Sequence, residues 1–310
     1  MKMTRMFIIG NGFDLAHGMK TSYEDFHQYL KEEYPDASFD GCVPEARMMP
    51  DGDMSYDDID VVGFLMEVIT NAEPKGEKWS DLETSLGYLD LDEYLDNWID
   101  DEDDDNEWHE VHRNEDLSAN LVGAVLEITD YFSEWIGKID IDEVAPKSEF
   151  EKLVNCDKDL FLTFNYTNTL EEIYKVKNVC HIHGKQGGKL LFGHGNDKDY
   201  TEEYMASHVG SEDSRQGMQE QLRKNTTEAI RGNQDFLNSI RSKSVDKVYS
   251  FGFSFSEVDE IYITEICRRL ANANVTWYLN DFDDLAIRTK YESIIKSCGF
   301  KGKFDTYHVS

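Results

Sequence analysis

A glycine-rich turn near the start of the chain could bind a phosphate group. Gly10, Asn11 and Gly12 follow the short apolar run 6–9, a pattern typical of a buried strand that enters a tight turn. In such a turn the bare backbone can approach a pyrophosphate and direct N–H groups at it. The dinucleotide fingerprint also needs glycine at position 15, where this chain has Leu15, so the ordinary Rossmann oxidoreductase motif is excluded.

Polar and glycine residues also follow three later strand predictions. They occupy the segments 163–167 (Thr-Phe-Asn-Tyr-Thr), 181–184 (His-Ile-His-Gly) and 252–256 (Gly-Phe-Ser-Phe-Ser). Ligands of an open parallel sheet bind in the crevice at the carboxyl ends of its strands. We therefore expect these segments and the glycine turn to form one rim.

The elements that position this rim alternate between strands and helices. Strands are predicted over 6–9, 160–163, 179–182, 190–192, 247–251 and 275–279, and helices from Thr21 onward and over 256–270 and 284–297. This alternation predicts an α/β fold with a three-layer, Rossmann-like, mostly parallel sheet. Between 36 and 150, apolar residues recur at helical spacing, which predicts a large acidic, all-helical insertion. The expected domains are a core of residues 1–35 and 151–310 and an insertion of residues 36–150.

Charge separates the same two parts. Of the net charge of −32, 34 acidic and six basic residues between Asp36 and Glu149 contribute −28. A surface this acidic repels nucleic-acid backbones and acidic lipids, so neither is an expected partner. No apolar run approaches the roughly 18 residues of a membrane span, and the N-terminal run is too short for a signal peptide. The five cysteines lack a C-x-x-C pair, which fits a reducing compartment, so a cytoplasmic protein is expected.

Two family resemblances run through these motifs. Gly10-x-Gly12 with a glycine six residues on, then Thr-Phe-Asn, His-Gly and Gly-x-Ser, resemble in this order the NAD-binding core of sirtuins. The phrase 9–18 (Ile-Gly-Asn-Gly-Phe-Asp-Leu-Ala-His-Gly), with Trp-Ser-Asp-Leu-Glu at 79–83, Phe-Gly-His-Gly at 192–195 and 252–259, resembles the AbiH family of bacterial phage abortive-infection proteins. The AbiH resemblance extends over nearly the whole chain, whereas the sirtuin resemblance covers only the core.

The sirtuin resemblance implies roles for particular residues. The asparagine of its Thr-x-Asn motif corresponds to Asn165, and its catalytic histidine corresponds to His183, which could act as a general base toward a ribose hydroxyl or water. A carboxylate would stabilise the positively charged ribose formed when nicotinamide leaves, and Asp14 and Glu83 are the candidates. The residues expected to bind NAD are Gly10, Asn11, Gly12, Phe13, Thr21, Thr163, Gly193, His194, Gly252, Ser254 and Asn280.

The chain also departs from sirtuins. They have alanine, serine and proline where this chain has Asn11, Asp14 and Lys20, and their zinc module of four cysteines is missing. Without an acyl-lysine groove, water is the simplest acceptor. We therefore expect hydrolysis of NAD to nicotinamide and ADP-ribose, or ADP-ribosyl transfer to another acceptor, with NAD as the substrate and no metal.

Other interpretations of the same residues stay open at this point. Asn165 could cap a helix that starts near Tyr166. His181 and His183 could bind a metal together with His194, as in a metal-dependent hydrolase, although no fourth ligand has a recognisable spacing. Glu83 could simply face solvent. The whole chain could instead be a nucleotide-sensing or partner-binding module without turnover.

The insertion is the expected sensor or regulatory surface. Its tryptophans Trp79, Trp98 and Trp135 are expected to be core anchors and not substrate platforms. A phage-derived trigger protein and a further copy of the chain, which would form a homo-oligomer, are the candidate protein partners.

Overall fold

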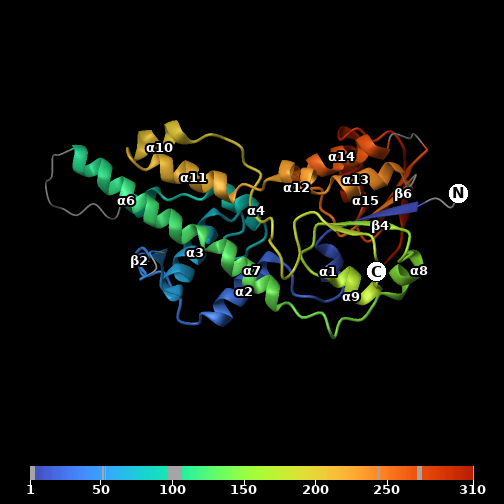
Figure 1. The fold of residues 1–310 in the computed structure, drawn as a ribbon, viewed down its shortest axis with the longest axis horizontal. Helices are drawn as coiled ribbons and strands as arrows, with labels where there is room; N and C mark the ends of the chain where they lie inside the picture. The colour runs from blue at the N-terminus through green and yellow to red at the C-terminus, as the bar shows by residue number, and fades with distance from the viewer. Residues whose placement is uncertain are drawn as a thin grey trace. The chain divides into compact units, whose positions relative to one another are not determined.

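Two units make up the structure (Figure 1). The computed structural model describes residues 4–50, 52, 54–96, 107–242, 245–270 and 274–309. The α/β unit comprises Met1–Ser22, Ile136–Leu191 and Asn225–Ser310. The helical unit comprises Tyr23–Trp135 and Phe192–Lys224.

A six-stranded sheet forms the centre of the α/β unit. Its strands are β1 (Thr4–Ile9), β4 (Leu160–Thr163), β5 (Val179–His181), β6 (Val245–Phe251), β7 (Thr276–Asn280) and β8 (Lys303–Tyr307). They lie in the order β5-β4-β1-β6-β7-β8, and every pairing is parallel. Following the chain, β4 and β5 are added on one side of β1, and β7 and β8 are then added on the far side of β6. In this doubly wound arrangement, ligands bind where the strand order reverses, between β1 and β6.

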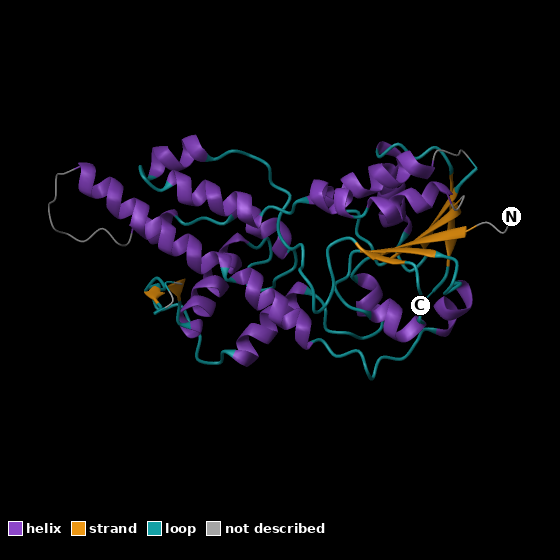
Figure 2. Cartoon of the chain, viewed as in Figure 1, coloured by secondary structure: helices purple, strands orange, loops and turns teal. Residues whose placement is uncertain are grey.

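Helices cover both faces of this sheet (Figure 2). Met6 and Ile8 of β1 lie in one core with α13 (Gln234–Ser242), α14 (Glu260–Leu270) and α15 (Leu285–Ser297). Phe7 and Ile9 point to the opposite face, as alternation along a strand requires. They lie in a second core with α1 (Gly12–Ala16), α8 (Ser148–Leu153) and α9 (Thr169–Tyr174). The predicted three-layer, Rossmann-like α/β fold is confirmed.

Five predicted strands coincide with β1, β4, β5, β6 and β7 to within two residues. The strand predicted at 190–192 is wrong. The Leu191 N–H there donates to the His183 carbonyl at 2.7 Å, and the Leu191 carbonyl accepts from the Tyr166 hydroxyl at 3.0 Å, so both groups are used outside a ladder. Strand β8 was not predicted, because the charged residues Lys303 and Asp305 alternate through it. It lies at the edge of the sheet, where a strand needs no continuous apolar run.

The second unit consists mainly of helices. They are α2 (Tyr23–Glu33), α3 (Asp58–Ala72), α4 (Leu82–Ser85), η1 (Leu86–Tyr88), α5 (Asp92–Asp96), α6 (Glu107–Leu126), α10 (Thr201–Ser207), α11 (Glu212–Leu222) and most of α7 (Ile128–Lys138), with a hairpin of β2 (Arg47–Met48) and β3 (Met54–Ser55). Trp79 and Trp135 are 1% and 5% exposed and pack on Phe26, so their prediction as core anchors is confirmed. Trp98 lies outside the described residues.

The bounds of the units differ from those expected from the sequence. Helix α2 belongs to the helical unit because its Phe26 packs on Trp79 and Trp135 of that unit. Residues 192–224 belong there as well, since Phe192 stacks on Phe132 with ring centroids 3.9 Å apart and α11 packs on α6. In contrast, α8 belongs to the α/β unit because Phe150 is buried in its second core. Each segment thus follows the core that buries its apolar side chains.

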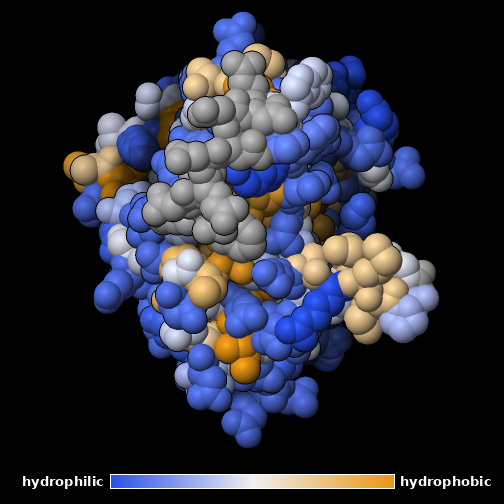
Figure 3. Space-filling model, turned by 90° about the vertical axis from the view of Figure 1, so that its left-hand side faces the viewer, coloured by the Kyte–Doolittle hydropathy of each residue, from blue (hydrophilic) through white to orange (hydrophobic). Residues whose placement is uncertain are grey.

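Hydrophilic side chains dominate the face shown in Figure 3. This agrees with the acidic composition of residues 36 to 149. Among the described residues, no helix combines the length and the apolar character that crossing a membrane requires.

The backbone of the β1–α1 turn touches the end of β6 at three glycines. The Gly10 N–H donates to the Phe251 carbonyl at 3.0 Å, and the Gly12 N–H donates to the Gly252 carbonyl at 2.9 Å. A Cβ at Gly12 would lie 2.6 Å from the Cα of Gly252, and a Cβ at Gly252 would overlap the Phe13 nitrogen. Gly252 also has a φ of +62°, which favours glycine. The turn and the strand can therefore meet only without side chains.

We expect Gly252→Ala to lower the free energy of unfolding much more than Gly187→Ala. Both glycines have a positive φ, +62° and +79°, but Gly187 has no atom within 4 Å of the added methyl group. Backbone strain of about 1–2 kcal/mol is common to both variants, whereas overpacking adds roughly 1–3 kcal/mol at Gly252 alone. Urea unfolding followed by tryptophan fluorescence measures both losses, and equal losses would contradict the close approach.

Candidate functional site

The carboxyl ends of four parallel strands carry the polar residues of the candidate site. Asp14 follows β1, Asn165 follows β4, His183 follows β5 and Ser254 follows β6, all within the α/β unit. Because the strands are parallel, their carboxyl ends lie at one edge of the sheet. The segments predicted to share a rim are therefore neighbours in the fold.

The first loop of this rim is held together from within. The N–H groups of Gly10 and Gly12 are both bonded to β6, so the phosphate contacts expected from these two groups are not open to them. Asn11 Nδ2 donates to the Thr21 carbonyl at 2.8 Å and closes the loop. Thr21 Oγ1 has no hydrogen-bond partner among the described residues, and α2 begins only at Tyr23, so Thr21 does not cap that helix.

Phe13 is a core residue in this structure. Its side chain is 0% exposed, and its ring centroid lies 5.0 Å from that of Phe150 and 5.1 Å from that of Phe251. His17, one turn later, has its Nε2 2.6 Å from the Tyr174 hydroxyl. These contacts fix α1 on the sheet, and they leave Phe13 no exposed surface for the ligand contact predicted for it.

Asp14 is a buried carboxyl with one hydrogen-bonded oxygen. It is 1% exposed, and its Oδ2 accepts from Thr167 Oγ1 at 2.6 Å. Thr167 Oγ1 in turn lies 2.8 Å from Thr169 Oγ1. Oδ1 of Asp14 has no hydrogen-bond partner among the residues that the structure describes. Burial raises the pKa of Asp14 to about 6, although Thr167, Thr169 and Asn165 act in the opposite direction. The carboxyl therefore changes its charge close to neutral pH.

Asn165 lies beside Asp14 with its amide group unpaired. Its backbone N–H donates to Thr163 Oγ1 at 3.1 Å, and its carbonyl lies 3.1 Å from His181 Nδ1. The side chain is buried and approaches Asp14 closely enough to lower the pKa of that carboxyl, yet neither amide atom has a hydrogen-bond partner among the described residues. The next helix, α9, begins at Thr169 and has Asn168 at its N-cap position, so the alternative in which Asn165 caps a helix starting near Tyr166 is wrong. Buried unpaired amides are rare and call for an explanation such as a bound group.

Two histidines at the end of β5 each lie beside a carboxylate. Burial is the largest single effect on the pKa of Glu171 and raises it, but the 2.8 Å hydrogen bond between its Oε1 and His181 Nε2, the charge of His181 and smaller contributions together lower that pKa. Nε2 of His183 lies 3.6 Å from Oδ1 of Asp259. Ser256 Oγ donates to the other oxygen of Asp259 at 2.8 Å. The Asp259 carboxylate is thus held in place to orient the His183 ring.

His181 and His183 face different carboxylates, Glu171 and Asp259. His194, the third histidine considered for a metal site, belongs to the helical unit. Within the described ranges, no three or more His, Cys, Asp or Glu side chains are grouped so that they could hold a metal ion.

The ends of β6 and β7 present different surfaces. Gly252 and Ser254, predicted to contact the adenosine side of NAD, are exposed. Asn280, predicted for the same role, is buried: its Nδ2 donates to the Val309 carbonyl at 2.8 Å and its Oδ1 accepts from the Phe282 N–H at 3.2 Å. Asn280 therefore fixes the C-terminal segment to β7.

Three further predicted residues lie in the helical unit, around Lys224. Lys224 Nζ forms an ion pair with Glu83 Oε1 at 2.6 Å, and the Lys224 N–H donates to the His194 carbonyl at 2.8 Å. A Cβ at Gly193 would overlap the Leu222 carbonyl oxygen. Burial lowers the pKa of His194 to about 4, so this imidazole is neutral at physiological pH. Glu83 and His194 therefore both contact Lys224, and Gly193 packs against the Leu222 carbonyl, all inside the helical unit.

The comparison with protein families decides the relationship of the chain. The family model described as bacteriophage abortive infection AbiH matches residues 6–281. The chain belongs to the AbiH family. Its role is therefore in abortive infection by bacteriophage. No curated protein and no solved structure matches the chain. The likeness of the core to sirtuins stays a prediction.

Several side chains that form hydrogen bonds or ion pairs with the predicted site residues were not found by reasoning from the sequence. Thr167 and Thr169 follow Asn165 closely, but only the fold brings them to Asp14. Asp259 stands three residues after Ser256, a spacing that allows their hydrogen bond and was a usable signal. Lys224 had no local signal, because its partner is distant in the sequence.

We expect Asp14→Asn to remove a pH dependence of stability. The pKa of Asp14 is 3.8 in its ordinary state and about 6 when folded, so the native protein binds more protons than the unfolded chain between these values. Stability from this group therefore falls as pH rises through that window, by up to about 3 kcal/mol at 1.36 kcal/mol per pKa unit. Urea unfolding of both proteins at pH values from 4 to 7 measures the difference. The upper limit lies ~1 pH unit above the pKa of the folded state, so the titration is nearly complete there.

A matched control is Asp305→Asn, which changes an exposed carboxylate on the edge strand. It should keep the pH dependence of the unsubstituted protein. If Asp14→Asn and Asp305→Asn behave alike, Asp14 is not the group that titrates.

Removing one partner of the Glu83–Lys224 pair should destabilise this AbiH protein more than neutralising both. The two side chains are 15% and 1% exposed, so either single change leaves a largely buried charge. Breaking such a pair typically costs ~3–5 kcal/mol, whereas neutral residues of similar volume often cost little. We expect Glu83→Gln and Lys224→Met each to lower the thermal unfolding midpoint and the double variant to recover part of the loss. If the midpoint of the double variant falls by the sum of the two single decreases, the two side chains are not energetically coupled and the expectation is contradicted.

Proposed function

We propose that this AbiH protein hydrolyses NAD to nicotinamide and ADP-ribose during phage infection. The observation that carries the proposal is the pair of Asn165 and Asp14. Both are buried at the carboxyl edge of the sheet, and three of their four side-chain polar atoms have no hydrogen-bond partner among the described residues. Leaving such atoms unpaired costs about 1–3 kcal/mol each. A substrate that bonds to them would account for their presence.

The position of the pair supports a nucleotide substrate. Asp14 lies just after β1, and Asn165 lies after β4, the neighbour of β1. The reversal of strand order between β1 and β6 is where doubly wound folds bind nucleotides. With the N–H groups of Gly10 and Gly12 engaged, the exposed Ser254 hydroxyl and the exposed Lys20 ammonium are the groups we assign to the phosphates.

NAD supplies nicotinamide as a leaving group, and its departure leaves positive charge on the ribose. Asp14 is the group that meets this charge, because its pKa of about 6 makes it a carboxylate at physiological pH. The hydroxyl of Thr167 holds one carboxylate oxygen and leaves Oδ1 for the substrate. The amide of Asn165 orients a ribose hydroxyl or the attacking water, since it offers one donor and one acceptor side by side.

His183 is assigned to accept the proton that water loses on attack. Its Nε2 lies 3.6 Å from Asp259 Oδ1, so the carboxylate would stabilise the positive charge that the ring gains when it accepts this proton. Attack by water forms the new carbon–oxygen bond as the bond to nicotinamide breaks, and the proton then leaves His183 for solvent. Glu83 has no part in this scheme, because Lys224 holds its carboxylate within the helical unit.

The test is nicotinamide release from NAD by the purified full chain and three variants. Asn165→Ala should abolish release, and His183→Ala should reduce it by ~100-fold or more, as loss of a general base does. Both should keep the fold and still bind NAD measurably. The control Asn178→Ala removes an amide that bonds to the Asp157 and Asp159 carbonyls at the amino end of the sheet, and it should retain release.

The same variants tested in phage-infected cells separate a restrained enzyme from an inactive one. A fall in NAD during infection that needs Asn165 and His183 supports the proposal, even when the purified resting protein is slow. Measurable NAD binding without release in either setting would overturn hydrolysis and favour the nucleotide-sensing module.

A further inference from the structure

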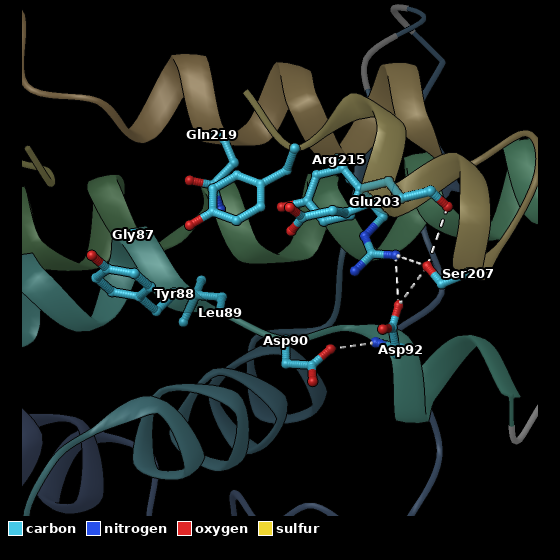
Figure 4. Close-up of a pocket in the computed structure, with 11 residues that line it drawn as sticks. Gly87, Tyr88, Leu89, Asp90, Asp92, Glu203, Ser207, Arg215 and Gln219 are labelled. Carbon is cyan, nitrogen blue, oxygen red and sulfur yellow. Dashed lines mark hydrogen bonds and ion pairs between the residues drawn. The ribbon is translucent and has the colours of Figure 1, made fainter. Parts of the chain in front are cut away.

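The helical unit contains a cavity that is independent of the candidate site (Figure 4). Its volume is about 260 Å³, and all of its lining residues belong to Tyr23–Trp135 or Phe192–Lys224. The segment from η1 to the start of α5 forms one wall, and α10 and α11 form the other. Figure 4 shows Arg215 and Gln219 projecting from α11 toward the facing wall that carries Asp90 and Asp92.

The guanidinium in this cavity is already neutralised. Arg215 is 3% exposed, and its Nη1 donates to Asp92 Oδ1 at 2.7 Å. Its other face is occupied as well, since its Cζ lies 3.9 Å from the centroid of the Tyr204 ring. An anionic ligand would have to compete with Asp92 for this cation, so Arg215 does not make the cavity an anion site.

One acceptor in the lining of the cavity has no hydrogen-bond partner among the described residues. Gln219 is 2% exposed and lines the cavity, and its Oε1 has no hydrogen bond among the described residues. A buried carbonyl of this kind costs about 1–3 kcal/mol unless a donor reaches it. The missing partner of Oε1 is thus an N–H or O–H group that the described residues do not supply to this oxygen.

The remaining charges in the lining are negative. Asp90 and Glu203 add two carboxylates to the neutral pair of Asp92 and Arg215. Glu203 Oε1 forms an ion pair with the exposed Lys198 at 2.6 Å, so Lys198 compensates part of its charge, and Asp90 adds a further carboxylate to the lining. The surrounding sequence from 36 to 149 carries a net charge of −28, so the potential around the cavity favours cations over anions.

We propose that this cavity binds a small organic cation with several N–H donors, such as a guanidinium group or a diamine. One donor meets Gln219 Oε1, and the positive charge lies between Asp90 and Glu203. The volume of about 260 Å³ equals that of roughly nine water molecules at ~30 Å³ each, which fits a ligand of about ten non-hydrogen atoms. The same chemistry could be supplied by a free amine or by an arginine side chain of a protein.

The test is binding of agmatine to the full chain, measured by isothermal titration calorimetry. Agmatine has a guanidinium and an ammonium group, and 4-guanidinobutanoate is the matched probe in which a carboxylate replaces the ammonium group. We expect agmatine to bind at least about tenfold more tightly, a factor that corresponds to 1.4 kcal/mol. Equal affinities, or no binding of agmatine, would overturn the proposal.

Variants locate the bound probe. Gln219→Leu should weaken agmatine binding about tenfold or more, because it removes the unpaired acceptor and keeps the volume. Glu203→Gln should weaken binding severalfold, and its exposed position makes it safe for folding. Glu202→Gln changes an exposed neighbour on α10 that does not line the cavity, so it should leave the affinity unchanged. Binding that no lining variant alters would place the probe elsewhere and contradict the proposal.

A second probe distinguishes the two sources of the cation. The capped tripeptide acetyl-Gly-Arg-Gly-amide carries the same guanidinium on a peptide. Tighter binding than agmatine, sensitive to Gln219→Leu, would identify a protein side chain as the ligand. Tighter binding of agmatine would identify a free amine.

Discussion

The close contact of backbone with backbone at Gly10, Gly12 and Gly252 is the constraint on which the rest of the site depends. It joins the end of β1 to the end of β6 at the point where the strand order reverses. It also fixes the start of α1, and thereby the position of Asp14. Glycine in this turn is usually explained by the approach of a phosphate. In this structure the approaching group is a neighbouring strand, and the two glycine N–H groups are consumed by it.

Asp14 and Asn165 are buried polar residues whose hydrogen-bonding groups are mostly unpaired among the described residues. A buried carboxyl and a buried amide lie side by side, and Thr167 supplies a hydrogen bond to only one of their oxygens. Local rules of polar satisfaction are broken in folded proteins mainly at functional sites, where the cost is offset by a bound group. The raised pKa of Asp14 belongs to the same arrangement, because a solvated carboxyl would titrate at its ordinary value. These features point to a site for a polar ligand even without the family relationship.

The two units differ in the charged and polar groups that they hold. The helical unit holds most of the acidic residues, a buried Glu83–Lys224 pair and a cavity lined by carboxylates. The α/β unit holds the rim with Asp14, Asn165 and His183. Our proposals assign a nucleotide to the α/β unit and a cation to the helical unit.

The sequence by itself determined the layered α/β fold, five of the six strands and the acidic helical region. Buried parallel strands are near-continuous apolar runs and helices repeat their apolar residues at fixed spacing, so local pattern alone carries this information. It also placed Asp14, Asn165 and His183 at strand ends, and parallel strands bring such ends to one edge.

Only the tertiary structure decided which of these residues have partners. The edge strand β8 has a mixed charged pattern, and residues 190–192 are apolar without forming a strand, because pairing depends on neighbours far along the chain. The same holds for Thr167 on Asp14, for Lys224 on Glu83 and for Asn280 on the Val309 carbonyl. Each contact joins segments that local spacing cannot relate. Whether a polar residue is structural or left unpaired for a ligand is a property of those contacts, and the sequence pattern does not contain it.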